Sequence, residues 1–314
     1  MNVQHKVRDY NAVPLIIGTR GSPLAIAQAE ETRNRLMRAH NLPETAFKIK
    51  IIKTTGDLVL DRPLSEIGGK GLFTVEIEES LLDGSIDVAV HSMKDMPTFL
   101  PSGLVISTIL PREDFRDSFV SRKFTGIGEL PKGCSVGTSS LRRKAQLLAL
   151  RPDLKVVEFR GNVQTRLRKL DEGVAEATFL ACAGLIRLGL LDLINPVEVN
   201  DMLPAVAQGA IGIEQKSDNE DIRSFLSPIH DQETALQLLV ERTFLSELDG
   251  SCRTPIGGLA QIIDDKIIFK GEILKLDGSQ IFKDTWSGHV SEAANLGKEA
   301  ALILKQKGGD GFFK

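Results

Sequence analysis

The stretch from Ile86 to Pro97, which reads IDVAVHSMKDMP, constrains the fold more than any other part of the chain. Its apolar beginning is typical of a buried strand, and the closing proline prevents a regular strand from continuing. Ligands of open α/β sheets bind beyond the carboxyl ends of the strands, so the polar end of this stretch is a candidate site. Solvated loop charges would explain any one of its polar residues, but the group together favours a site. The group consists of His91, Ser92, Lys94 and Asp95.

Strand-like and helical segments alternate around this stretch, which predicts an α/β fold with a mostly parallel sheet. From about residue 232, a helix, three strands and a final helix indicate a small α+β domain. A polar turn at 111–117 and a small apolar stretch at 202–213 indicate that the chain enters a second domain and returns. The predicted strands are 15–19, 47–55, 86–90, 104–110, 134–138, 155–159, 178–181, 259–263, 266–274 and 280–288, and the predicted helices are 23–40, 72–82, 139–150, 232–248 and 291–305.

The composition excludes several classes of protein. The net charge of −3 and the aromatic content of 5% argue against nucleic-acid binding, which usually needs a basic surface and stacking platforms. The three cysteines are odd in number and show no C-x-x-C spacing, so we expect neither disulfides nor a zinc site, and a reducing cytoplasm fits best. No signal-peptide pattern or membrane-length apolar run occurs, so we expect a soluble, intracellular protein.

Arginines gather at two predicted helix starts, where the helix macrodipole disfavours cations. Arg142 and Arg143 open one helix, and Arg160 and Arg166 surround the start of the next. No acid in either motif compensates for them, and local rules tend to be broken at functional sites. An external carboxylate or phosphate held by guanidinium and backbone N–H groups would explain the pattern. Pairing with acids elsewhere in the fold is the alternative, but four such arginines after two successive strands favour the anion site.

The first helix offers a similar site. We expect Ser22 to cap this helix and Pro23 to occupy its first position, with Arg20 beside an end that can bind anions. A surface arginine next to a well-capped helix explains the pattern equally well. Lys70 ends a long glycine-rich loop at 56–71 and could also reach an anion. From its glycines and its length, we expect this loop to act as a flexible lid.

The cysteines differ in their surroundings. Cys134 and Cys182 lie in apolar strand contexts and are expected in the core. Cys252 lies in a Gly-Ser-Cys-Arg-Thr-Pro loop, where Arg253 would favour the thiolate. A nucleophile, a covalent cofactor anchor and a redox sensor are all possible roles, while an ordinary loop cysteine is the simplest reading of this residue alone. A cysteine hydrolase is poorly supported because no histidine partner is visible nearby.

Together these motifs resemble the porphobilinogen deaminase (hydroxymethylbilane synthase) family, in the family's order, from about residue 15 to 260. The matching stretches are GTRGSPLA at 18–25, GGKGLF at 68–73, HSMKDMP at 91–97, GTSSLRR at 137–143, RGNVQTR at 160–166, LPAVAQGA at 203–210 and GSCRTPIG at 250–257. The resemblance implies two α/β lobes like those of type-2 periplasmic binding proteins and a small C-terminal α+β domain. The implied domains are 1–113 with 210–230, 114–209, and 231–314.

The family resemblance implies an activity. Four porphobilinogen molecules are condensed head-to-tail, with release of ammonia, to give hydroxymethylbilane in tetrapyrrole (haem) biosynthesis. The chain grows on a dipyrromethane cofactor that is joined by a thioether to Cys252 and made from the enzyme's own substrate chemistry. Asp95 matches the family's catalytic aspartate, whose carboxylate would stabilise the cationic azafulvene-like species left when ammonia departs. An Asp95 that only orients Lys94 is the alternative. The family expectation is a monomer. From the sequence itself we expect a cytoplasmic protein with no membrane, nucleic-acid or metal partner.

The resemblance also carries over individual residues. Each pyrrole bears an acetate and a propionate, so a mildly acidic protein must concentrate cations in one place to hold the growing chain. The implied cofactor-binding residues are Cys252, Lys94, Asp95, Thr138, Ser139, Ser140, Arg142, Arg143, Arg160, Gly161 and Arg166. The implied substrate-binding residues are Arg20, Ser22, Arg160, Arg166, Arg187, Lys70 and Gln208.

One departure and one rival remain. Some family members have a lysine at the position of Glu66, so the number of cations on the loop before Lys70 stays open. The rival function is a non-enzymatic carboxylate-binding protein of the same fold. Such a protein would need neither Cys252 in a loop nor Asp95 among cations, and this favours the enzyme.

Overall fold

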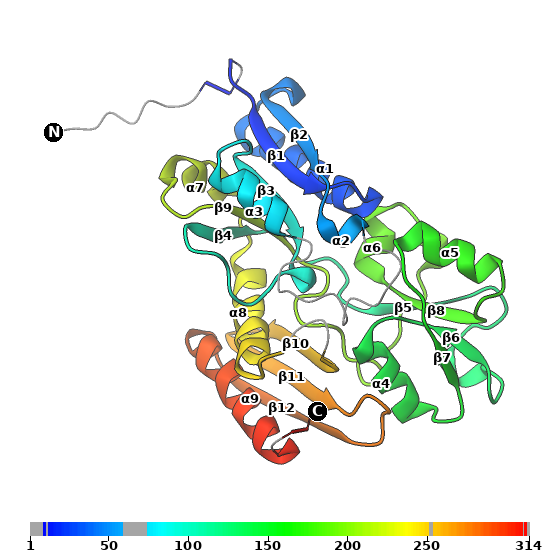
Figure 1. The fold of residues 1–314 in the computed structure, drawn as a ribbon. Helices are drawn as coiled ribbons and strands as arrows, with labels where there is room; N and C mark the ends of the chain where they lie inside the picture. Colours follow the sequence, from blue (N-terminus) through cyan, green and yellow to red (C-terminus); the bar gives the residue numbers. More distant parts are fainter. Residues whose placement is uncertain (1–8, 11, 59–73, 251–253, 310, 313–314) are drawn as a thin grey trace. The chain divides into compact units, whose positions relative to one another are not determined.

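The computed structural model describes residues 9–10, 12–58, 74–250, 254–309 and 311–312 (Figure 1). The chain forms two compact units, Met1–Arg112 with Ala210–Ala235 and Glu113–Gly209 with Leu236–Lys314. The division into three domains stays a prediction. Within the described residues, no helix is long and apolar enough to cross a membrane.

The first unit is built on one mixed sheet with the strand order β2-β1-β3-β9-β4. β2, β1 and β3 are parallel, whereas β9 runs antiparallel to both β3 and β4. Four of the five strands therefore run in the same direction, as predicted, and β9 is the exception, because part of the expected connection at 202–213 enters the sheet as this strand. The strands are β1 (Leu15–Arg20), β2 (Phe47–Ile52), β3 (Val88–Ser92), β4 (Leu104–Ile109) and β9 (Ile211–Lys216).

The helices of this unit follow local signals. Ser22 caps the first helix by accepting a hydrogen bond from the Ala25 N–H at 3.2 Å, and a proline occupies the first turn, both as predicted. A short helix replaces the first residues of the loop predicted at 56–71, and the rest of that loop lies outside the described residues. The helices are α1 (Pro23–His40), α2 (Thr55–Leu58), α3 (Val75–Leu82) and α7 (Glu220–Leu226).

The second unit contains a four-stranded sheet with the order β5-β8-β6-β7. β8, β6 and β7 are parallel, and the unpredicted edge strand β5 is antiparallel to β8. Ser140 and Asn162 cap the helices that follow β6 and β7, so both helices begin where the arginine motifs predicted. The elements are β5 (Asp117–Ser121), β6 (Ser135–Gly137), α4 (Leu141–Leu150), β7 (Lys155–Val157), α5 (Val163–Asp171), β8 (Ala177–Ala181) and α6 (Cys182–Arg187).

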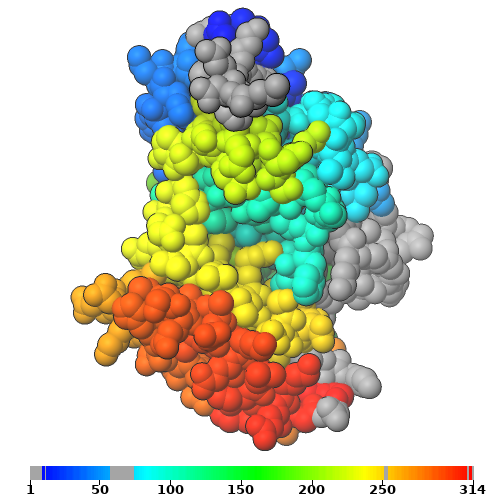
Figure 2. Space-filling view, turned by 90° about the vertical axis from the view of Figure 1, so that its left-hand side faces the viewer, coloured from blue at the N-terminus to red at the C-terminus, as the bar shows by residue number. Residues whose placement is uncertain are grey.

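The C-terminal part of the second unit is an antiparallel three-stranded sheet with the order β10-β11-β12. The rings of Phe244 and Phe269 pack edge to face in its core, with their centroids 4.9 Å apart. α9 packs on β11 and β12, and its outer side is exposed in Figure 2. The elements are α8 (Gln232–Glu247), β10 (Ile256–Ile263), β11 (Lys266–Leu274), β12 (Ile281–His289) and α9 (Ala293–Gly308). The predicted class of α/β sheets with a small α+β portion is confirmed.

At Gly297, α9 lies against the backbone of α8, and substitution of this residue tests that packing. A Cβ at this position would overlap the Val240 carbonyl oxygen and lie 3.2 Å from the Phe244 nitrogen, and backbone atoms cannot easily move away. We expect Gly297→Ala to lower the free energy of unfolding by about 2–3 kcal/mol in urea denaturation. Gly128→Ala is the control, because open space surrounds Gly128. Equal stability of the two variants would contradict this packing.

Glu272 of β11 makes stability depend on pH. Burial raises the pKa of Glu272 to about 7, although Arg142 and Lys283 attract its charge. The folded state therefore binds more protons than the unfolded state between pH 4.5 and about 7, so this carboxyl lowers stability as the pH rises through that window. We expect Glu272→Gln to match the wild type at pH 4.5 and to exceed its free energy of unfolding by about 1–3 kcal/mol at pH 8.

The matched control for this pH effect is Glu299→Gln, since Glu299 is exposed on α9. Thermal or urea unfolding across the pH range measures both variants. A Glu272→Gln profile parallel to that of the wild type would rule out the raised pKa.

Candidate active site

The polar end of β3 continues as one 3-10 turn, Met93–Asp95. The Met93 N–H donates to the Ala210 carbonyl at 3.0 Å, and the Met93 side chain fills the space that a Cβ on Gly212 would need. Met96 is also buried, whereas the Asp95 carboxylate is exposed. Two buried methionines thus anchor the backbone on either side of an accessible carboxylate.

The other polar residues of this stretch do not all face solvent. His91 is buried, and its Nε2 lies 3.0 Å from Oε2 of the fully buried Glu214 on β9. Ser92 exchanges hydrogen bonds with the buried Gln28 of α1, at 2.7 and 3.0 Å. These two polar residues therefore hold β3 in place, and Asp95 remains the accessible acid of the group. The sequence did not single out Glu214 or Gln28, because each lies in an otherwise ordinary strand or helix.

Arg20 and Ser22, two predicted anion-binding residues of the first unit, lie at the same sheet edge as Asp95. β1 and β3 are parallel neighbours with Gly18 opposite Ala89, so their carboxyl ends meet. Arg20 is the half-buried last residue of β1, and Ser22 caps the helix that follows. The fold therefore gathers a cation, a helix N-terminus and a carboxylate at one edge.

In the second unit, Arg142 and Arg143 are buried and share one acid, Asp117. Arg142 Nη2 donates to Asp117 Oδ2 at 2.7 Å, and Arg143 Nη2 donates to Oδ1 at 2.6 Å. Their Nη1 atoms donate to the carbonyls of Leu203 and Phe179 at 2.6 and 2.7 Å. The alternative of pairing with an acid elsewhere in the fold therefore holds for Arg142 and Arg143, while their role in binding an anion stays a prediction. Asp117 is the first residue of β5 and lies far from the arginines in sequence, so no local sequence pattern could predict this pairing.

Electrostatic attraction holds Asp117 and the two arginines together. Burial opposes the ionised form of Asp117, but the attraction of Arg142 and Arg143 and their hydrogen bonds outweigh it and hold the pKa of Asp117 well below its usual value. Gln208, which is 1% exposed, adds a third donor through Nε2 to Asp117 Oδ1 at 2.8 Å. The Nε atoms of both arginines are buried and have no hydrogen-bond partner among the described residues.

Hydroxyl and arginine donors surround the neighbouring helix starts. The oxygens of Thr138, Ser139 and Ser140 each accept a backbone N–H, so the hydroxyl hydrogens can still donate to an anion. Because β6 and β7 are parallel neighbours, these residues share a sheet edge with Arg160. Half-buried Arg166 donates from Nε to the Gly161 carbonyl at 2.9 Å.

Gly161 holds the start of α5 in a conformation that favours glycine. Its φ is +117°, and a Cβ there would lie 2.5 Å from the Thr165 side chain. Arg187 Nη1 donates to the Gly209 carbonyl at 3.0 Å. The predicted binding roles of Gly161, Arg187 and Gln208 are not tested by these contacts.

Two predicted site residues, Lys70 and Cys252, lie outside the described residues. Of the other cysteines, Cys182 is buried and Cys134 is half-buried. Burial raises the pKa of the Cys182 thiol to about 12, which makes it a poor nucleophile. Across the described segments, no cluster of histidine, cysteine, aspartate and glutamate could hold a metal ion.

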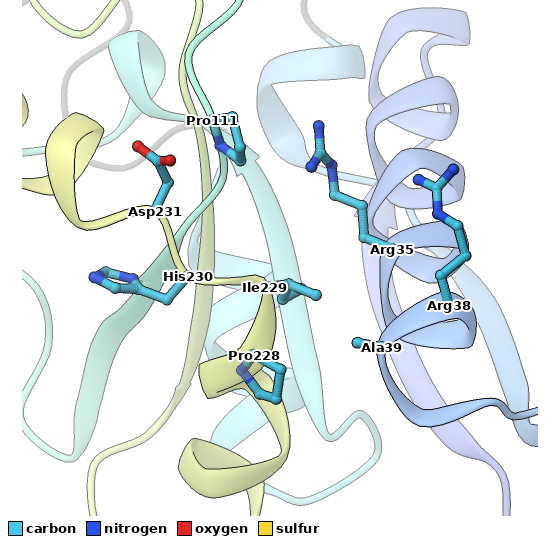
Figure 3. Close-up of a pocket in the computed structure, with 8 residues that line it drawn as sticks. All are labelled: Arg35, Arg38, Ala39, Pro111, Pro228, Ile229, His230 and Asp231. Carbon is cyan, nitrogen blue, oxygen red and sulfur yellow. The ribbon is translucent and has the colours of Figure 1, made fainter.

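A pocket of about 270 Å³ lies in the first unit, beside the C-terminal half of α1 (Figure 3). Three of its polar side chains are engaged: Arg35 pairs with Glu31, His230 Nδ1 accepts the Ile109 N–H, and Asp231 accepts the Thr234 N–H. None of the predicted site residues lines it, so it does not form part of the candidate site. The lining residues are Arg35, Arg38, Ala39, Pro111, Pro228, Ile229, His230 and Asp231.

Comparisons with known proteins agree with these features. The model "Porphobilinogen deaminase, dipyromethane cofactor binding domain" matches residues 15–224, and "Porphobilinogen deaminase, C-terminal domain" matches residues 235–306. The porphobilinogen deaminase of Paracoccus denitrificans is 59% identical over 301 residues, which cover 96% of each chain. That of Nitrobacter hamburgensis is 54% identical over 298 residues, which cover 95% of this chain and 94% of the relative.

One solved structure shows a distant likeness. A nutrient-binding protein from Burkholderia cenocepacia bound to methionine has a TM-score of 0.41 and 13% identity, covering 70% of this chain and 93% of that one. This likeness adds nothing to the fold derived from the strand order. The two matching domain models and the curated relatives span nearly the whole sequence, and on that ground the chain belongs to the porphobilinogen deaminase family.

Proposed function

We infer that this protein is a hydroxymethylbilane synthase, a transferase that condenses four porphobilinogen molecules head-to-tail with release of ammonia. The observation that carries this inference is the match to family members over 96% of the chain. An exposed Asp95 at the carboxyl end of β3 supports it, because this is where an α/β sheet binds its ligand.

Asp95 is proposed as the catalytic acid–base residue. Loss of ammonia from porphobilinogen leaves a cationic pyrrole, and a carboxylate facing the ring N–H groups would stabilise that charge and assist proton transfer. The turn supports this role because its backbone is fixed by Met93 while the carboxylate stays accessible. Lys94, half-buried beside it, would hold a carboxylate of a bound pyrrole.

The family's dipyrromethane cofactor fits the donor set of the second unit. When bound, it supplies the covalent anchor for the growing pyrrole chain. We propose that Cys252 holds it by a thioether. The unpartnered Nε donors of Arg142 and Arg143 and the hydroxyls of Thr138, Ser139 and Ser140 would bind its carboxylates.

Substrate carboxylates need further cations. Arg20 and Ser22 at the first unit's sheet edge, and Arg160 and Arg166 at the second unit's, are proposed to bind them. Their half-buried positions restrict the side chains while leaving them accessible, which favours bidentate recognition. Arg187, Lys70 and Gln208 complete the proposed substrate-binding set, and Gly161 belongs to the proposed cofactor-binding set.

Cellular context is also part of the proposal. We propose a cytoplasmic monomer divided into three domains, 1–113 with 210–230, 114–209 and 231–314. The net charge of −3 supports the absence of a nucleic-acid partner. The rival, a carboxylate-binding protein without activity, is not favoured by the family assignment.

Asp95→Asn tests the catalytic role. We expect turnover of porphobilinogen to fall by about a thousandfold, because the amide cannot neutralise the cationic ring or accept its proton. The cofactor should remain attached, as measured by denatured intact mass. Asp218→Asn, which changes an exposed aspartate in the same unit, serves as the control. Turnover above about a tenth of the wild-type value would exclude Asp95 as the catalytic acid–base residue.

Cys252 can be tested by mass. The denatured wild-type protein should carry the added mass of two linked pyrrole rings on the peptide that contains Cys252, and should give a colour with Ehrlich's reagent. Cys252→Ser should abolish both, and Cys134→Ser should retain both because Cys134 is a strand-flanking thiol. A wild-type chain that gains no pyrrole mass after incubation with porphobilinogen would refute the proposed function.

A further inference from the structure

Glu241 of α8 is a buried carboxylate that the proposed chemistry does not use. It is fully buried, and its two oxygens accept hydrogen bonds from two separate backbone segments. Oε2 accepts from the Ala207 N–H at 2.6 Å, and Oε1 accepts from the Ala260 N–H of β10 at 2.8 Å. One side chain thereby joins α8, β10 and the segment 203–208.

The Ala207 end of this contact is a strained turn. Ala207 has a φ of +61°, in the left-handed region that residues with a Cβ avoid, and it is buried. A backbone held in this conformation needs its surroundings to compensate for the cost. The short hydrogen bond from the Ala207 N–H to Glu241 is such a compensation.

Gln208, the next residue, connects this turn to Arg142 and Arg143 through Asp117. Gln208 donates from Nε2 to both the Phe115 carbonyl and Asp117 Oδ1, at 2.8 Å each. Asp117 in turn holds Arg142 and Arg143. The same segment also contacts Arg142 directly, since the Leu203 carbonyl accepts from its Nη1. The orientation of both guanidinium groups therefore depends on the conformation of the turn.

We propose that Glu241 is a positioning residue for the cofactor-binding arginines, acting through Ala207, Gln208 and Asp117. This rests on the proposed function, in which Arg142 and Arg143 bind the cofactor carboxylates. In this role Gln208 orients Asp117. The competing role is a structural one, in which Glu241 only fastens β10 to α8 through Ala260.

The rate at which the protein acquires its cofactor distinguishes the positioning role of Glu241 from the structural one. The full-length protein, produced without its cofactor, is incubated with porphobilinogen, and the fraction carrying two pyrrole rings is followed over time by denatured intact mass. We expect Glu241→Gln to load about tenfold more slowly than the wild type, because its amide cannot accept both backbone hydrogen bonds. Glu247→Gln is the control, since it replaces a glutamate by glutamine on the same helix.

Rescue separates the two roles. Glycine adopts a positive φ readily, so Ala207→Gly should bring Glu241→Gln back to within about threefold of the wild-type loading rate. Gln208→Met should also load slowly, because methionine cannot donate a hydrogen bond to Asp117. Ala207→Gly should not rescue this variant, because relieving the turn does not restore that hydrogen bond. This second variant keeps the proposal testable if Glu241→Gln does not fold.

The outcomes are distinct. Wild-type loading rates in Glu241→Gln or in Gln208→Met would overturn the positioning role. A slow Glu241→Gln that Ala207→Gly fails to rescue would assign Glu241 to the fastening of β10 and overturn it too. A wild-type chain that never gains pyrrole mass would instead overturn the proposed function on which the inference rests.

Discussion

The second unit depends on one buried carboxylate, Asp117. It joins the edge strand β5 to the first turn of α4 through two arginines, and to the segment 203–208 through Gln208. Two guanidinium groups would be costly to bury alone, and a single acid shared between them compensates for part of that cost. The buried Nε donors of both arginines have no hydrogen-bond partner among the described residues, and in the proposed function they bind an anionic ligand. The interaction that stabilises this unit thus also prepares its proposed binding site.

In the first unit, the packing exposes one acid, Asp95, on a backbone that is held in place. β9 enters the sheet antiparallel between β3 and β4 and places Gly212 under Met93, so the methionine side chain occupies the space that a larger residue would fill. His91 and Ser92 form hydrogen bonds within the unit, and Asp95 is left at the surface. Apolar packing and buried polar pairs therefore position a side chain that itself contacts neither.

Local sequence patterns predicted some parts of this architecture and missed others. The cap at Ser22, the starts of α4 and α5, and the strand Lys266–Leu274 follow from residues a few positions apart. β5 and β9 were missed because their short runs mix apolar with polar residues, namely Asp117 and Ser118 in one and Glu214 and Gln215 in the other. These polar side chains are buried only because distant partners satisfy them.

The sequence by itself determined the longer helices, most strands and the family, together with the residues that match its motifs, because those depend on periodicity, caps and contiguous residues. Only the tertiary structure decided the direction of β9, the acid that pairs with Arg142 and Arg143, and which polar residues around Asp95 are buried. Each of these depends on contacts between residues that are far apart along the chain, such as Asp117 and Arg142 or His91 and Glu214. Such contacts form when strands pair and side chains leave water, and no window of neighbouring residues records them.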